Sequence, residues 1–122
     1  MQRVNIVSYI FTVMVFLGTL GFIANQSNRN ELILTAVLQN NIEATKFLLT
    51  QNIDVNHKYK HNHTLLHSAT LYGDINMVRL LVRNGAMLSS NDFGLTAMSG
   101  ARDSNNSEII SFLTNSYNIE EK

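Results

Sequence analysis

Short apolar stripes, each broken by a polar or small residue, recur along most of the chain. Their apolar positions lie three or four residues apart, which is the spacing of one helix face, and Asn, Asp or Gly stands at the breaks. The pattern therefore predicts an all-α fold built from three pairs of helices. The expected pairs span residues 31–39 and 42–50, 65–72 and 75–83, and 97–103 and 107–114.

The first pair shows how the stripes are expected to pack. Asn28, followed by Glu31 three residues later, has the form of a capping box, and Asn30 is a competing cap. The first helix is therefore expected to begin near Glu31, after a polar linker over residues 25–30. The side chains expected to share the apolar stripes are Leu32, Ala36 and Val37 on the first helix and Ala44, Phe47 and Leu48 on the second.

Two positions of the pattern are filled by either Gly or Asn. Asn40, Gly73 and Asn105 each follow the first helix of a pair, and Asn52 and Gly85 follow the second helix of the first two pairs. Gly and Asn enter the left-handed backbone conformation that often ends a helix more easily than other residues do. We therefore expect this conformation at these positions.

The middle of the chain carries a block of residues that returns in both directions. It includes the segments 64–69 and 84–86, which read Thr-Leu-Leu-His-Ser-Ala and Asn-Gly-Ala. Residues of the same physical type stand about 33 residues earlier, where Ala36 corresponds to Ala69, and about 32 residues later. A fixed period of this size indicates a stacked repeat architecture.

This block resembles an ankyrin repeat, whose unit of about 33 residues carries the signature Thr-Pro-Leu-His-x-Ala. Thr64, Leu66, His67 and Ala69 match the signature, and the resemblance extends over residues 29–118 as one strong copy and two weaker ones. The chain contains no proline, which removes a rigid helix start and lowers the stability expected of the fold. The residues at the proline position are Leu32, Leu65 and Ala97.

The resemblance implies an ankyrin-repeat solenoid with short β-hairpin loops. Its domain would occupy residues 31–122, with units over about 31–58, 59–91 and 92–118. In such a unit the Thr caps the first helix and hydrogen-bonds the His, and a polar last unit closes the stack. The residues expected to have these structural roles are Thr64, His67, Gly73, Gly85 and Thr96.

The amino-terminal segment has a different pattern. Residues 6–24 carry no charge, are rich in Ile, Val, Phe and Leu, and follow Arg3. We expect residues 1–24 to be either a cleaved export signal or a membrane anchor that contacts the bilayer through residues 6–24. Both fates remain open, and each places the repeats across or at the plasma membrane. A buried helix of the repeat domain is disfavoured because no amphipathic period is visible.

Composition narrows the chemistry. The chain has 122 residues, 45% of them hydrophobic, and a formal net charge of +0, which provides no general field for nucleic acid. It has no cysteine, and it lacks a nucleophile with a base at recognisable spacing, a phosphate-binding Gly-rich loop and a His-Glu-x-x-His motif. We therefore expect neither catalysis, nor a cofactor, nor a bound metal, nor a small-molecule substrate.

The stretch from His57 to His63 falls where the resemblance places a protruding loop between units. Together with the exposed face of each first helix, these loops would form the concave surface that binds another protein. Histidine, lysine and aromatic side chains are residue types suited to such an interface. The residues expected to bind the partner are Lys58, Tyr59, Lys60, His61, His63, Leu71, Tyr72, Phe93, Leu95 and Arg102.

Three functional hypotheses follow. The leading one is an exported, non-enzymatic protein-binding module, periplasmic or secreted, that could act as an effector on a host protein. The second is a single-pass membrane protein whose repeats recruit or regulate a membrane partner. The third is a metal or pH sensor that uses His57, His61, His63 and His67.

Overall fold

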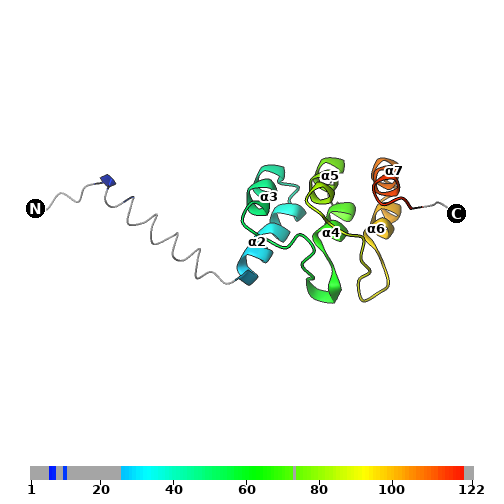
Figure 1. The fold of residues 1–122 in the computed structure, drawn as a ribbon, viewed down its shortest axis with the longest axis horizontal. Coiled ribbons are helices and arrows are strands. Elements are labelled where there is room, and N and C mark those ends of the chain that lie inside the picture. Colours follow the sequence, from blue (N-terminus) through cyan, green and yellow to red (C-terminus); the bar gives the residue numbers. More distant parts are fainter. Residues whose placement is uncertain (1–5, 8–9, 11–25, 73, 120–122) are drawn as a thin grey trace, which may run out of the picture.

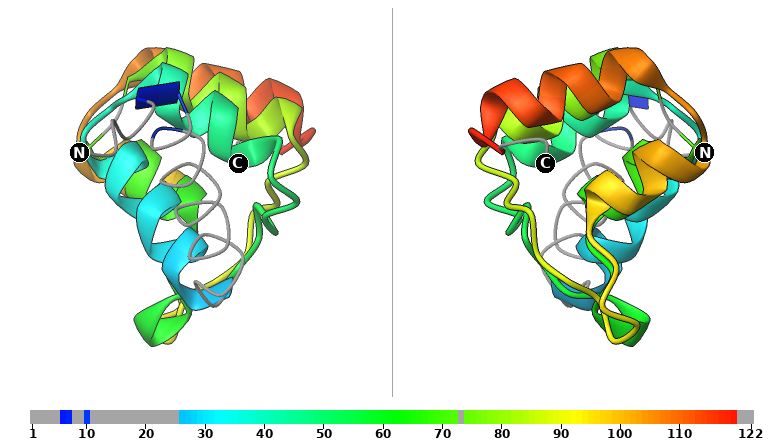
Figure 2. Two further views of the ribbon diagram at one scale, coloured as in Figure 1. Left: turned by 90° about the vertical axis from the view of Figure 1, so that its left-hand side faces the viewer. Right: turned by 90° about the vertical axis from the view of Figure 1, so that its right-hand side faces the viewer.

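The computed structural model describes residues 6–7, 10, 26–72 and 74–119, and the structural statements below concern these residues. They confirm the all-α fold and the three stacked helix pairs (Figure 1). The first helices of the pairs form one layer and the second helices form the other (Figure 2). The pairs are α2 (Gln26–Leu38) with α3 (Ile42–Leu49), α4 (Leu65–Tyr72) with α5 (Ile75–Arg83), and α6 (Ala97–Asp103) with α7 (Ser107–Ser116).

The start of the first helix differs from the prediction. α2 begins at Gln26, so residues 26–30 of the expected linker are helical, and Asn28 and Asn30 lie inside the helix instead of capping it. Asn30 is buried, and its carbonyl oxygen accepts a hydrogen bond from the Tyr59 hydroxyl at 2.7 Å. The capping-box pattern could not reveal this distant partner, because Tyr59 belongs to the loop before the second unit.

Each second helix has a side-chain cap at its amino end. The backbone N–H of Ala44 donates to Asn41 Oδ1 at 3.0 Å, and the N–H of Ile109 donates to Asn106 Oδ1 at 3.1 Å. Asp74 Oδ1 accepts from Asn76 and Met77 at 2.9 and 3.1 Å. These bonds satisfy helix N–H groups that have no partner within the helix, which stabilises each short helix by about 1 kcal/mol.

The left-handed positions agree with the sequence. Asn40, Asn52 and Asn105 have φ angles of 51°, 58° and 52°, and Gly85 has a φ angle of 89°. The fifth expected position, Gly73, lies outside the described residues. The shared backbone conformation explains why Asn and Gly alternate at equivalent places in successive units.

The core runs along the stack between the two helix layers. Its largest buried side chains come from every unit: Ile33, Val37, Leu65, Leu66, Met77, Val78, Leu81, Ile109 and Leu113. Two side chains expected on the packed stripes of the first pair are instead exposed, Leu32 at 58% and Phe47 at 64%. They face the end of the stack, where the described chain provides no further helix pair to cover them.

The loops between units protrude as two fingers, finger 1 over residues 57–63 and finger 2 over residues 91–95 (Figure 1). Each is closed by a backbone hydrogen bond, from Tyr59 to His63 at 2.8 Å and from Asn91 to Leu95 at 2.9 Å. A short 3-10 turn (Lys60–Asn62) forms the tip of finger 1. The loops are thus hairpin-shaped turns, and no strand is assigned in the described residues.

The amino-terminal segment is mostly outside the described residues, which include only Ile6, Val7 and Ile10 of residues 6–24. Among the helices that the structure describes, none combines the length and the apolar character needed to cross a membrane. The signal and anchor hypotheses for this segment therefore stay predictions.

Candidate protein-binding surfaces

His67 connects the second and third units from inside the structure. Its Nδ1 atom lies 3.2 Å from the Thr64 backbone nitrogen and 2.9 Å from Thr64 Oγ1, and its Nε2 atom lies 3.0 Å from the Leu95 carbonyl oxygen. Thr64 directly precedes α4, and Leu95 closes finger 2. One side chain thus joins the start of α4 to the loop before α6.

The two neighbours of the imidazole determine its protonation. The Thr64 N–H is a donor, so Nδ1 must accept, and the Leu95 carbonyl is an acceptor, so Nε2 must carry the hydrogen. Burial is the largest cause of the lowered pKa of His67, and nearby His63 and Lys58 add to it, whereas the hydrogen bond to Leu95 opposes it. The neutral imidazole of His67, which is hydrogen-bonded through both ring nitrogens, therefore has a structural role.

The third unit has only part of this arrangement. Thr96 stands at the amino end of α6, as Thr64 does before α4, but its side chain makes no capping hydrogen bond. The residue three positions later is Ser99, whose N–H donates to the Thr96 carbonyl at 3.0 Å. Ser99 cannot reach a following finger as His67 does, which is consistent with a unit at the end of the described stack.

Finger 1 is hydrogen-bonded to the first helix pair through Tyr59. Tyr59 is half-buried, its hydroxyl bonds to Asn30 in α2, and its ring contacts that of His57 edge-on at 4.8 Å. Burial, followed by the nearby charges of Glu31 and Asp54, raises the pKa of Tyr59. Tyr59, expected to anchor a partner, therefore has its polar atom engaged inside the protein.

Finger 1 is also bonded to finger 2. Asn62 Nδ2 donates to Asp92 Oδ1 at 2.6 Å, and His61 Nδ1 lies 3.8 Å from Asp92 Oδ2. The Asp92 N–H donates to the His61 carbonyl at 2.9 Å, and Asn91 Nδ2 lies 3.2 Å from His63 Nε2. These contacts make the two fingers one continuous surface.

The expected binding residues divide into two groups on this structure. Leu71, Leu95 and His63 line one small hollow of about 40 Å³ between α4 and finger 2. Others extend into solvent outside the lining of this hollow: Tyr72 is 68% exposed and Phe93 is 64% exposed. The finger surface, as we define it, consists of the exposed residues Lys58, Lys60, His61, Leu71, Tyr72, Phe93, Leu95 and Arg102.

The histidines do not converge on a metal position. The rings of His63 and His67 are 5.2 Å apart, but both nitrogens of His67 already have protein partners. Within the described part of the chain, no group of three or more His, Asp or Glu side chains could hold a metal ion. This geometry gives the metal-sensor hypothesis no support.

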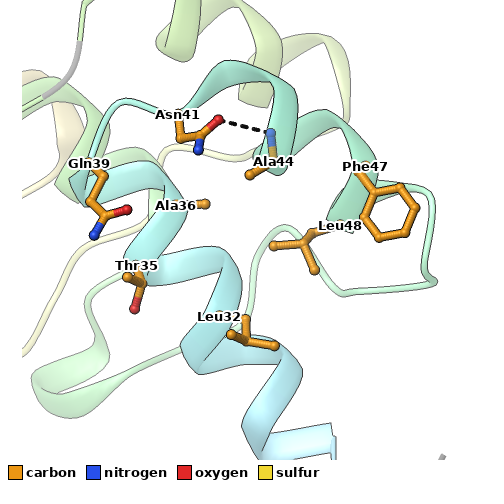
Figure 3. A pocket seen from close by; sticks show the side chains of 8 residues that line it. All are labelled: Leu32, Thr35, Ala36, Gln39, Asn41, Ala44, Phe47 and Leu48. Atoms are coloured by element: carbon orange, nitrogen blue, oxygen red, sulfur yellow. Dashed lines mark hydrogen bonds between the residues drawn. The ribbon is translucent and has the colours of Figure 1, made fainter. Parts of the chain in front are cut away.

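A second surface escaped the sequence analysis. At the open end of the first pair, a groove of about 330 Å³ runs between α2 and α3, with Phe47 at its edge (Figure 3). Its signal in the sequence was the apolar stripe that was assigned to the core. We call it the end groove, and its lining consists of Leu32, Thr35, Ala36, Gln39, Asn41, Ala44, Phe47 and Leu48.

Comparison with known proteins agrees with this architecture. A family model described as ankyrin repeats, in three copies, matches residues 13–122. The mouse (Mus musculus) serine/threonine-protein kinase TNNI3K is 43% identical over 65 residues, as is its rat (Rattus norvegicus) counterpart. These matches cover 52% of this chain and 7% of each kinase. Alpha-latrotoxin-Lg1a of Latrodectus geometricus is 36% identical over 84 residues, which are 66% of this chain and 6% of the toxin.

Proposed function

Because the chain belongs to the ankyrin repeat family, whose repeats are protein-interaction modules, we propose that it binds a partner protein through the finger surface, without catalysis. The relatives contain much more than the matched segment, since this chain spans less than a tenth of each of them. The kinase and toxin activities in their names therefore provide no argument for this chain.

The observation that supports this surface is its exposed aromatic and aliphatic side chains, which lie on a helix and on loops joined by hydrogen bonds. Tyr72 and Phe93 extend into solvent from α4 and finger 2. The backbone of Tyr72 belongs to a helix, and that of Phe93 belongs to a finger that hydrogen bonds join to finger 1. Rigid, exposed aromatic side chains are frequent binding hot spots because they lose little conformational entropy on binding. Lys58, Lys60 and Arg102 add positive charge, while exposed Asp92 on finger 2 and Asp103 at the hollow add negative charge. The partner would therefore present an apolar patch with charges of both signs around it.

The test is affinity for a partner captured by the wild-type chain and then purified. Replacing Tyr72 and Phe93 together by Ala is expected to weaken binding by on the order of a hundredfold, because two hot-spot side chains are lost. Met87→Ala is the control, since Met87 is 60% exposed but belongs to neither the finger surface nor the end groove. Equal affinity of the double variant and the wild type would reject the finger surface as the binding site.

The location of this module is a separate proposal. The charge-free residues 6–24 after Arg3 support export to the periplasm or the outside, where the module could act as an effector on a host protein. If the segment is retained, it supports a single-pass protein that recruits a membrane partner. The intact mass of the protein in soluble and membrane fractions separates the two, because only cleavage removes the segment. A full-length chain in the soluble fraction would contradict both.

A further inference from the structure

The residues that line the end groove have the composition of an interface and not that of an ordinary, water-exposed surface. None of its eight lining residues is charged, although Leu32 and Phe47 are more than half exposed. Protein surfaces that stay in contact with water normally carry charge, whereas the centres of interfaces are depleted in it. The outer face of a terminal repeat has to be polar for a stack to remain soluble on its own. The described first unit does not meet this condition.

The rest of the molecule restricts what could cover the groove. The helices at the opposite end, α6 and α7, have no exposed large hydrophobic side chain. The exposed residues of α7 are Ser107, Glu108, Ser111, Asn115 and Ser116. A second copy that stacked head to tail would therefore place a polar, charged surface on an apolar one. Among end-to-end contacts of the described stack, only the meeting of two end grooves therefore places an apolar face on an apolar face.

We propose that two copies of this chain pair through their end grooves about a two-fold axis. Each copy offers a hollow between α2 and α3 and a projecting ring, Phe47, at its edge (Figure 3). A two-fold contact brings the ring of each copy to the hollow of the other, so the surface can be complementary to itself. Because the lining is uncharged, like faces do not repel each other.

Pairing at this end has a consequence for binding. The fingers project from the side of the stack, whereas α2 and α3 form its first pair (Figures 1 and 2). The residues that line the end groove belong to this pair and to the turn between its helices. Both finger surfaces therefore remain free in the pair, and a dimer would present two of them to its partner. Such a two-site arrangement increases the apparent affinity for a partner that is itself multivalent or held on a surface.

The absence of cysteine from the chain makes the pairing directly testable. Ala44→Cys places one thiol in the groove, and Ser111→Cys places one on the exposed face of α7 at the other end. The full chain is treated with a short bis-maleimide reagent, in detergent if it is recovered from membranes. We expect a covalent dimer for Ala44→Cys in about tenfold excess over Ser111→Cys, since a shared interface brings the thiols together.

A second set of variants separates pairing through the groove from pairing through any other part of the chain. Phe47→Glu adds a charge to the groove and is expected to abolish cross-linking of Ala44→Cys, while Phe93→Glu, a change at an equally exposed ring, leaves it intact. Three results would overturn the proposal. They are equal cross-linking at both ends, cross-linking that persists with Phe47→Glu, and a monomer in which the thiol introduced by Ala44→Cys is either freely labelled or covered by another segment of the same chain.

Discussion

The two ends of the described stack have the same architecture and opposite surfaces. The helices α2 and α3 form one end, and α6 and α7 form the other (Figure 1). The first end exposes Leu32 and Phe47, and the second exposes serine, asparagine and charged side chains. Both pairs have side-chain caps and a left-handed Asn between their helices. The local sequence rules therefore build the unit, while the residues on its outer face decide whether it can end a stack.

The largest difference is expected between apolar residues that look alike in the sequence but lie at different depths. Leu113→Ala on α7 removes a side chain with no exposed area and should lower the free energy of unfolding by about 2–5 kcal/mol. Leu32→Ala on α2 removes one that is mostly exposed and should change it by no more than about 0.5 kcal/mol. Urea unfolding measures both changes in free energy, at protein concentrations low enough to avoid pairing of two chains.

Similar losses for the two variants would mean that Leu32 is covered within a single chain. The end groove would then be filled by another part of the same molecule, and the contrast between the two ends would disappear. Leu38→Ala is a useful companion variant because Leu38 is exposed on α2 but does not line the groove.

The stripes of the first pair also mark the limit of what the sequence could predict. Helical periodicity finds the residues on a face, and it correctly placed α4, α5 and α6 to the residue. It cannot say whether that face meets another helix, because this depends on what packs next to it. Leu32 and Phe47 were therefore assigned to the core although they lie at its edge.

The finger surface shows a second limit. The spacing identified the loops, and Leu71, Leu95 and His63 do share one hollow. The same reasoning selected Tyr59 for a partner, but the structure bonds its hydroxyl to Asn30 in the preceding unit. A tyrosine can serve either as an exposed anchor for a partner or as a hydrogen-bond donor between units. Only the three-dimensional structure shows which of the two roles it has.

A somewhat smaller loss of stability is expected from a change at the contact between α6, in the last described pair, and α4, in the middle pair. A Cβ atom added to Gly100 in α6 would lie 2.7 Å from Thr70 Oγ1 and 3.1 Å from Leu71 Cγ in α4. Gly100→Ala should therefore lower the free energy of unfolding by about 1–3 kcal/mol, despite the higher helix propensity of Ala. Thermal unfolding measures the loss.

The double variant Gly100→Ala with Thr70→Ala is its control. Removing the Thr70 hydroxyl makes room for the new methyl group, so the two changes together should cost less than the sum of their separate effects. Strict additivity would show that the α4–α6 contact is looser than the described geometry.

Stability is expected to fall at both low and high pH. We call these two parts of the pH profile the acid limb, which His67 produces, and the alkaline limb, to which Tyr59 contributes. The pKa of folded His67 is below its ordinary value of 6.5, so the unfolded chain binds a proton more readily and stability falls as the pH drops below about 6.5. The pKa of folded Tyr59 is above 10.0, so the unfolded chain loses its proton first and stability falls as the pH rises above about 10. Melting temperatures measured across this pH range report both limbs.

Two variants assign these limbs. His67→Gln should remove the acid limb attributed to the bonds with Thr64 and Leu95, and it should keep the alkaline one. Tyr59→Phe should keep the acid limb and reduce the alkaline one, because it removes the hydroxyl that bonds to Asn30. Burial also raises the pKa of Tyr117, whose share of the alkaline limb should remain. An acid limb that is unchanged in His67→Gln would show that other groups produce it, and would weaken the assignment of a neutral imidazole.

The smallest expected effect distinguishes two left-handed asparagines, one near each end. Asn40 and Asn105 have almost the same φ angle, so the backbone gain from replacing either by Gly should be only a few tenths of a kcal/mol. Asn40 Nδ2 also donates to Asp74 Oδ2 at 3.2 Å, a bond that is the main reason for the lowered pKa of Asp74. Asn40→Gly should therefore cost about 1 kcal/mol more than Asn105→Gly in urea unfolding, since it loses a hydrogen bond between the first two units. If the two variants were equally stable, the Asn40–Asp74 bond would contribute nothing, and the open end would be held to the stack by apolar packing and by the bond from Tyr59 to Asn30.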